Sequence, residues 1–314
     1  METTGFIKYL EEKDLAPTTQ KGYLLVVKYF FDWAKTEDVQ VTKPDILRYL
    51  EYQKNKRKMN NVCRKNYLIA LNHYFTYLYK EEIISQNPCA YIKIKGRRPQ
   101  KMYNTYTPEE LDTLFDNYYN VYVRNFDDSH LRKKARGQAF LCRERNVILL
   151  SVFVNQGATT NEIRQIQLDD VDLIKAKIRL RGGKRSNERI LPLKATQIGL
   201  FMHYLQNIRP KLAEYQTNDS KIFFLSLPAI SEKTTDGGTL LWAYNTLTLQ
   251  LKEIDKRFVS FVQLRTSVIT NWLKKEGLRK TQYLAGHRYV SSTEKYKPNN
   301  LDDLIEDINK LNPF

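Results

Sequence analysis

The sequence predicts a mainly α-helical protein with one small antiparallel sheet, an α+β fold divided into two domains. Apolar residues recur at spacings of three and four along most of the chain, which is typical of helices with one buried face. Two short alternating segments flank Gly182-Gly183 and indicate a β-hairpin. The length of 314 residues favours two domains at about 150 residues each.

Residues 1–84 are predicted to form a compact domain of four helices. The first two follow from apolar patterns that begin at Phe6 and at Thr18. Thr42-Lys43-Pro44-Asp45 is a typical helix start, with threonine as the cap and proline in the first turn. Asn60 or Asn61 can cap the fourth helix, whose apolar face includes Leu68, Leu71, Tyr74, Phe75 and Leu78.

Two basic stretches in this part of the chain are candidate DNA contacts. Residues 85–106 lack helical periodicity and are predicted to be a basic linker suited to crossing a phosphate backbone, or else a solvated tether. A second basic run lies between the third and fourth helices, where it could meet phosphates or simply be a solvated helix end. The candidate residues are Lys54, Lys56, Arg57, Lys58, Lys93, Lys95, Arg97 and Arg98.

Residues 107–314 are predicted to form the second domain. Thr107-Pro108-Glu109-Glu110 reads as a capping box that starts a helix. A polar stretch at 124–137 suggests a loop or frayed helix, and the apolar stretch 146–154 predicts a buried helix. Strands are expected at 177–180 and 188–193, and further helices from about residues 195, 241 and 266 onward.

Charge indicates the class of partner. The chain carries 51 Lys and Arg against 35 Asp and Glu, a net charge of +16, which attracts polyanions. No basic segment has a strongly apolar opposite face, so nucleic acid is favoured over a membrane surface. No apolar run approaches the roughly 20 residues of a membrane span, and the first residues do not resemble a secretory signal. Three widely spaced cysteines fit a reducing cytoplasm.

The common enzyme signatures are missing from the sequence. It contains no HExxH, no Walker A loop, no GxGxxG and no GxSxG. Its four histidines include no i,i+4 pair, so neither a metal nor another cofactor is expected. What remains is chemistry on phosphates performed by side chains alone.

Four segments carry a specific resemblance. Residues 284–296 read LAGHRYVSSTEKY and residues 263–267 read QLRTS. Residues 182–193 read GGKRSNERILPL, and residues 157–163 read GATTNEI, followed by DDVDL at 169–173. Taken in their order along the chain, and at the separations they have there, the segments resemble the sequence boxes of the tyrosine recombinases, the phage integrase family. The resemblance covers about residues 180–310 strongly, and the helical first domain and linker match the layout of the family.

The resemblance implies a fold and a set of roles. Residues 1–84 would be a SAM-like core-binding domain and residues 107–314 a catalytic domain. Tyr296 would be the nucleophile that forms a 3′-phosphotyrosine with DNA, and Lys184 the general acid for the departing 5′-oxygen. Arg265 would clamp the non-bridging oxygens of the phosphate, His287 would donate a further hydrogen bond, and Glu162 would orient its neighbours.

Two positions depart from the family pattern. Thr159 stands where the family has its first arginine, and Val262 stands where it has its first histidine. Arg164, Arg143 or Arg145 could supply the missing cation. Otherwise the resemblance implies either a slow enzyme or a relative that binds DNA without cutting it.

The implied function is site-specific recombination or integration of DNA, in a mobile element of a prokaryotic type, by a cytoplasmic, nucleoid-associated protein. The partners would be double-stranded DNA and other copies of the chain, assembled as a tetramer on synapsed DNA and otherwise as a monomer or dimer. An apolar stripe in a C-terminal helix at 299–311 would contact a neighbouring protomer, or would pack on its own domain. The alternatives are a non-cleaving DNA-binding relative, a nicking-closing enzyme like the type IB topoisomerases, and a basic RNA-binding or structural protein.

Overall fold

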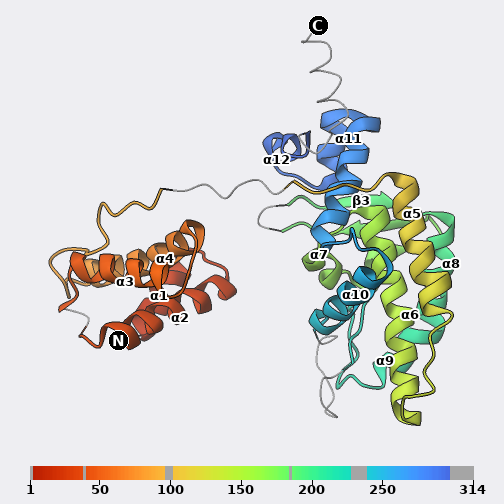
Figure 1. The fold of residues 1–314 in the computed structure, drawn as a ribbon, viewed down its shortest axis with the longest axis horizontal. Helices are drawn as coiled ribbons and strands as arrows, with labels where there is room; N and C mark the ends of the chain where they lie inside the picture. Colours follow the sequence, from red (N-terminus) through yellow and green to blue (C-terminus); the bar gives the residue numbers. More distant parts are fainter. Residues whose placement is uncertain (1–2, 38–39, 96–101, 184–185, 228–238, 298–314) are drawn as a thin grey trace, which may run out of the picture. The chain divides into compact units, whose positions relative to one another are not determined.

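A computed structural model describes residues 3–37, 40–95, 102–183, 186–227 and 239–297 (Figure 1). The chain divides into two compact units, Met1–Lys101 and Met102–Phe314. Each unit has its own cluster of buried apolar side chains. None of the described helices is long and apolar enough to cross a membrane.

The first unit is a four-helix domain. Its helices are α1 (Thr3–Glu12), α2 (Pro17–Ala34), α3 (Lys43–Asn55) and α4 (Asn61–Lys80). Asp45 accepts the backbone N–H of Thr42, and the Asn60 side chain accepts that of Cys63, so both predicted helix starts are confirmed. Aromatic rings fill much of the core, including fully buried Phe6, Phe30, Tyr74 and Phe75.

The second unit is mainly helical. Its elements begin with α5 (Pro108–Asp116), the π-helical turns η2 (Asn117–Val123), α6 (Lys133–Gln156) and α7 (Thr160–Gln165). They continue with the 3₁₀ turn η3 (Leu168–Asp170), α8 (Ala195–His203), the π-helical turns η4 (Tyr204–Ile208), α9 (Arg209–Ala213), α10 (Leu241–Ile254), α11 (Phe261–Ala285) and α12 (Val290–Glu294).

The small sheet has the antiparallel order β1-β2-β3, with β1 (Val171–Asp172), β2 (Lys177–Leu180) and β3 (Arg189–Pro192). Ile178 pairs with Leu191, and Leu180 pairs with Arg189. The predicted hairpin and the predicted fold class are therefore confirmed. The sequence missed β1 because two residues are too few to show an alternating pattern.

One helix is much longer than predicted. The expected buried helix at 146–154 is the C-terminal part of α6, which begins at Lys133 inside the stretch predicted to be a loop or frayed helix. The first half of α6 carries charged residues on most turns, so it shows no apolar face until its buried second half.

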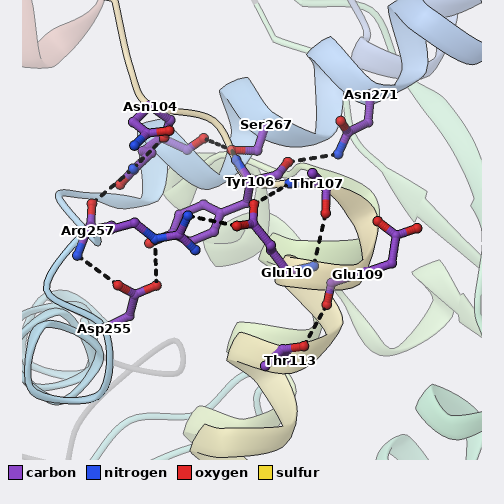
Figure 2. A network of polar contacts seen from close by, with 11 residues as sticks. Asn104, Tyr106, Thr107, Glu109, Glu110, Thr113, Asp255, Arg257, Ser267 and Asn271 are labelled. Carbon is purple, nitrogen blue, oxygen red and sulfur yellow. Dashed lines mark hydrogen bonds and ion pairs between the residues drawn. The ribbon is translucent and has the colours of Figure 1, made fainter.

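The start of the second unit is fastened to α11 (Figure 2). Ser267 Oγ accepts the backbone N–H of Tyr106 at 2.9 Å, and the Asn271 side chain donates to the Tyr106 carbonyl at 3.0 Å. Arg257 stacks on the Tyr106 ring and donates to Glu110 at 2.7 Å. These contacts tie the helix that begins at Thr107 to the element that carries Arg265.

Much of the stretch assigned to the linker packs on one unit or the other. Cys89 is buried in the core of the first unit, and Ile92 and Ile94 pack against that core. The Asn87 side chain donates to Asn72 and Thr76 of α4. Tyr106 is held on α11 as described above, and the Gln263 side chain of α11 donates to the carbonyl of Asn104 at 2.8 Å. Residues 96–101 lie outside the described residues.

Candidate active site

Arg265 lies on α11, where two backbone carbonyls fix its guanidinium. Nη1 donates to the carbonyl of Gly157 at 2.5 Å, and Nη2 donates to that of Ala285 at 2.8 Å. These carbonyls belong to the loop after α6 and to the end of α11. The side chain keeps 11% of its surface exposed. Arg265 is therefore oriented before any ligand binds, yet it remains accessible.

Behind Arg265 lies a buried ion pair between Glu162 on α7 and Arg189 on β3. Arg189 donates twice to the carboxylate, at 2.6 and 3.3 Å, and the Arg189 side chain is fully buried. Arg265 Nη1 is 3.6 Å from Glu162 Oε2. Two cations thus face one anion, which leaves a positive charge in excess where a phosphate would bind.

These charges govern the pKa of Glu162. Burial alone would raise it, but the hydrogen bond from Arg189 and the charges of Arg189 and Arg265 outweigh burial and hold it below its usual range. Glu162 is therefore a buried carboxylate that stays ionised. In Arg189 burial has the larger effect, and it lowers the pKa of the guanidinium.

Thr159, at the position of the expected arginine, caps α7. Its hydroxyl accepts the N–H of Glu162 at 3.2 Å and donates to Glu162 Oε2 at 3.0 Å, while its own N–H donates to the same oxygen at 2.7 Å. This is a capping box. The threonine thus holds the carboxylate that Arg189 and Arg265 share, but it brings no charge to the site.

The hairpin meets the loop after α11 at Gly286. Asn187 donates its N–H to the Gly286 carbonyl at 2.9 Å, and Ser186 forms a β-bridge with His287. Gly286 has a φ of +67°, and a Cβ there would lie 2.5 Å from Arg189 Nη1. Only glycine fits both the backbone conformation and the space. Lys184, in the turn of this hairpin, lies outside the described residues.

His287 lies between Arg265 and Tyr296. Its Nε2 is 3.4 Å from Arg265 Nη2, and its Nδ1 is 2.8 Å from the hydroxyl of Thr293. Its ring stacks on the Tyr296 ring with centroids 5.6 Å apart and planes at 19°. Burial, followed by the charges of Arg265 and Arg189, lowers the pKa of His287 to about 4. The imidazole is therefore neutral at pH 7.

Tyr296 is half-buried two residues beyond the end of α12, which lies beside α11 (Figure 1). Its N–H donates to the carbonyl of Thr293 at 3.0 Å. The structure thus brings together Arg265, His287, Glu162 and Tyr296, which are spread over 135 residues of the sequence. Val262, at the position of the expected histidine, is 57% exposed on α11.

The three arginines considered as replacements lie in different surroundings. Arg143 is 7% exposed and stacks on the Phe126 ring at 3.9 Å. Arg145 is 3% exposed and donates to the carbonyl of Leu225 and to the Asn146 side chain. Both side chains are therefore buried. Arg164 is exposed on α7, two residues beyond Glu162.

Two residues of the site, Arg189 and Thr293, have no role predicted from the sequence. Arg189 stood in the hairpin motif, and its alternation with Leu191 and Leu193 would have placed it on the core face. Thr293 stood in the C-terminal box without an assigned role, because spacing does not reveal which side chain meets His287. Among the described residues, no cluster of His, Cys, Asp and Glu side chains could hold a metal ion.

The two basic stretches of the first unit adjoin one another. The Asn61 side chain, at the start of α4, donates to the backbone carbonyl of Lys95 at 2.8 Å. Lys93 and Lys95 are exposed and alternate with Ile92 and Ile94, which pack on the core. The other stretch, Lys54, Lys56, Arg57 and Lys58, is exposed just before α4. We call these six residues the basic surface; Arg97 and Arg98 lie outside the described residues.

Comparison with known proteins identifies the class. The sequence pattern of the phage integrase family matches residues 130–302, and that of the N-terminal SAM-like domain of phage integrases matches residues 4–85. Such proteins break and rejoin DNA strands. The chain belongs to the phage integrase family, the tyrosine recombinases, which confirms the family and the enzyme class expected from the sequence motifs.

Individual relatives are similar over nearly the whole chain. The tyrosine recombinase XerC of Anoxybacillus flavithermus is 27% identical over 93% of this chain and 90% of the relative. That of Oceanobacillus iheyensis is 27% identical over 98% of this chain and 94% of the relative.

Solved structures share the fold. XerH site-specific recombinase bound to a palindromic difH substrate aligns with a TM-score of 0.67 at 18% identity, covering 96% of this chain and 82% of that chain. A lambda integrase dimer bound to a COC′ core site aligns with a TM-score of 0.58 at 14% identity, covering 94% and 75%.

Proposed function

We propose that this chain is a site-specific DNA recombinase that cuts and rejoins DNA through a 3′-phosphotyrosine on Tyr296. The observation that carries the proposal is the position of His287, whose ring stacks on Tyr296 while its Nε2 lies 3.4 Å from Arg265. A nucleophile, a neutral imidazole and a guanidinium that keeps 11% of its side-chain surface exposed thus adjoin one another. The buried pair of Glu162 and Arg189 supports them from behind, and with Arg265 it leaves one positive charge in excess.

In the proposed reaction the phenolic oxygen of Tyr296 attacks the scissile phosphorus, and the bond from phosphorus to the 5′-oxygen breaks. The phenol gives up its proton to solvent water, and the departing 5′-oxygen gains one from Lys184, which regains a proton from solvent, so charge and atoms balance. Arg265 and His287 stabilise the charge that develops on the non-bridging oxygens. Because the tyrosyl ester keeps the energy of the phosphodiester, attack by a second 5′-hydroxyl reverses the step.

DNA is the proposed partner, and the basic surface of the first unit supports this. Its six cations lie next to the start of α4, and the chain has a net charge of +16. Such a surface gains affinity from the release of counterions around phosphates.

The missing first arginine favours a second candidate, a relative that binds DNA without cutting it. Thr159 is neutral and already engaged as a helix cap, so it cannot replace a guanidinium at the phosphate. Of the three proposed replacements, Arg164 alone is exposed.

The trapping of a covalent adduct tests both candidates. Duplexes that the Tyr296→Phe variant retains from a random library define a binding site. That site is then rebuilt with a nick near the cleavage position, so that the cut fragment diffuses away. We expect the wild type to give an adduct that survives a denaturing gel, and the Tyr296→Phe variant to give none. A wild type that binds this duplex but never forms an adduct would support the non-cleaving relative.

The same preparation separates a recombinase from a nicking-closing enzyme like the type IB topoisomerases. A recombinase needs its site and a partner site, whereas a nicking-closing enzyme relaxes any supercoiled plasmid. We expect exchange between two plasmids that carry the site, and no relaxation of a plasmid that lacks it.

We also propose that the recombinase serves a mobile element and acts as a tetramer on synapsed DNA. The C-terminal stripe of Leu301, Leu304, Ile305, Ile308 and Leu311 is suited to contact a neighbouring protomer, although these residues lie outside the described ones. Deletion of residues 299–314 is expected to weaken synapsis and to spare binding to one half-site. Unchanged synapsis would show that the stripe packs on its own domain.

A further inference from the structure

Thr293 connects the two groups at the centre of the site. It is fully buried at the end of α12. Its hydroxyl lies 2.8 Å from His287 Nδ1, and its carbonyl accepts the N–H of Tyr296 at 3.0 Å. One residue thus holds both the imidazole ring and the backbone of the proposed nucleophile.

The partners of His287 determine which of its nitrogens carries the proton. A guanidinium can only donate hydrogen bonds, so Nε2, which faces Arg265 Nη2, must accept. In a neutral ring the proton then resides on Nδ1, which donates to the Thr293 hydroxyl. Without DNA, therefore, the nitrogen that faces Arg265 has no proton to offer to a phosphate.

We propose that Thr293 is a positioning residue that, together with Arg265, favours the Nδ1-protonated tautomer of His287 in the absence of DNA and reverses its own hydrogen bond when a phosphate binds. A hydroxyl both accepts and donates, so it can serve either tautomer. When a non-bridging oxygen reaches Nε2, Nδ1 passes its proton to solvent water and Nε2 takes a proton from solvent water, so no net proton is gained or lost. The ring stays neutral, and the hydroxyl now donates to Nδ1. This inference rests on the proposed function for its DNA-bound state only.

The tautomer of His287 without DNA and the reversal of the hydrogen bond on phosphate binding are testable separately. The tautomer without DNA is read from the ¹⁵N chemical shifts of histidine-labelled protein, in which the protonated and unprotonated ring nitrogens differ widely. The chain has four histidines, and a His287→Gln variant identifies the signals of His287. We expect a protonated Nδ1 in the wild type and in Thr293→Ser. In Thr293→Val, which keeps the shape but lacks the hydroxyl, the Nδ1–H loses its acceptor. We therefore expect a larger share of the Nε2-protonated ring than in the wild type, with Arg265 still opposing it.

A Thr293→Val protein with the same tautomer populations as the wild type, or a wild type that carries the proton on Nε2, would overturn the inference. Neither result depends on cleavage, so neither bears on the proposed function. Should Thr293→Val fail to fold by circular dichroism, Thr293→Ala is read in the same way. Ser292→Ala, a change at the adjacent half-buried hydroxyl, is the matched control and should leave the His287 signals unchanged.

The bound state is tested by single-turnover formation of the covalent adduct. Loss of one hydrogen bond from a positioning group predicts about a ten-fold slower reaction for Thr293→Val, with unchanged DNA affinity and with rescue by Thr293→Ser. Equal rates for Thr293→Val and the wild type would overturn the reversal step. No adduct from the wild type would instead count against the proposed function, while the spectra would still decide the tautomer.

Discussion

At the scale of single residues, the site depends on a buried charge. Glu162 is ionised although it lies within the protein, and it stays so because Arg189 donates to it twice and Thr159 donates from both its hydroxyl and its N–H. Removal of one partner from such a pair leaves the other charged and desolvated, which costs more than the net worth of the pair.

We therefore expect Glu162→Gln to lower the free energy of unfolding by about 3–5 kcal/mol, because Arg189 is left buried without an anion. Urea denaturation measures the loss. The matched control is Asp112→Asn, which removes the partner of Lys194 in an ion pair of 2.7 Å whose side chains are about half exposed. That change should cost less than about 1 kcal/mol. Equal losses in the two variants would contradict the role given to burial.

Gly286 is a second position where a single added atom, a Cβ, determines the stability of the protein. We expect Gly286→Ala to destabilise the protein by about 1–3 kcal/mol, because a positive φ and a close approach to Arg189 Nη1 and Asn187 O combine. Gly199→Ala is the control, since it lies exposed within α8 with open space around it. There alanine should stabilise by about 0.5–1 kcal/mol. Thermal or urea unfolding compares the two, and a neutral result at Gly286 would contradict the packing.

His287 makes stability depend on pH. Its pKa is about 4 in the folded protein against 6.5 for an ordinary histidine, so the unfolded chain binds a proton more readily. Its contribution is therefore fully present above pH 6.5 and is lost as the pH falls toward 4. Between pH 7 and pH 5 we expect the wild type to lose about 1–2 kcal/mol more than His287→Gln does. Urea titrations at both pH values measure the difference, and identical pH profiles would show that His287 is not the cause.

At the scale of elements, the sequence predicted helix starts and hairpin strands well where residues within a single turn determine them. The capping box at Thr107, the helix starts at residues 195 and 241, and the hairpin strands all lie where the sequence expects them. The sequence failed where a tertiary contact decides the element. The first half of α6 and the two-residue β1 have no periodicity of their own: the former continues the helix of the buried second half, and the latter is held by its pairing with β2.

The short helix α7 shows how an element can tolerate the loss of a family residue. Thr159 is a good N-cap, so the replacement of arginine by threonine strengthens the helix that carries Glu162. We expect Thr159→Arg to cost about 1 kcal/mol of stability through loss of the cap and to speed adduct formation, because a guanidinium returns to the phosphate. Thr159→Ser, which keeps the cap, should change neither quantity by much. A slower reaction in Thr159→Arg would indicate that another cation already occupies that place.

At the scale of the whole molecule, the sequence predicted which boxes matter but not how they are joined. Arg265, His287, Glu162 and Tyr296 were named from motifs, and they adjoin in the second unit. Arg189 and Thr293, which fix the positions of these residues, were not named, because contacts between segments far apart in the chain leave no mark on local spacing. The same limit applied to Arg143 and Arg145, which look like available cations in the sequence and are buried in the structure.

The net charge makes its own prediction, because a surplus of +16 acts on any polyanion. If the basic surface meets the DNA backbone, replacement of Lys56, Arg57 and Lys58 by glutamine removes up to three phosphate contacts. The slope of log affinity against log salt should then fall by about 2–3, equally for specific and random duplexes. Fluorescence anisotropy at several salt concentrations measures both slopes. The control replaces three exposed lysines on α1 and α2, Lys8, Lys21 and Lys28, with the same change in net charge. A similar loss of slope in the control would mean that affinity follows total charge, and that the cations beside α4 have no special place at the DNA.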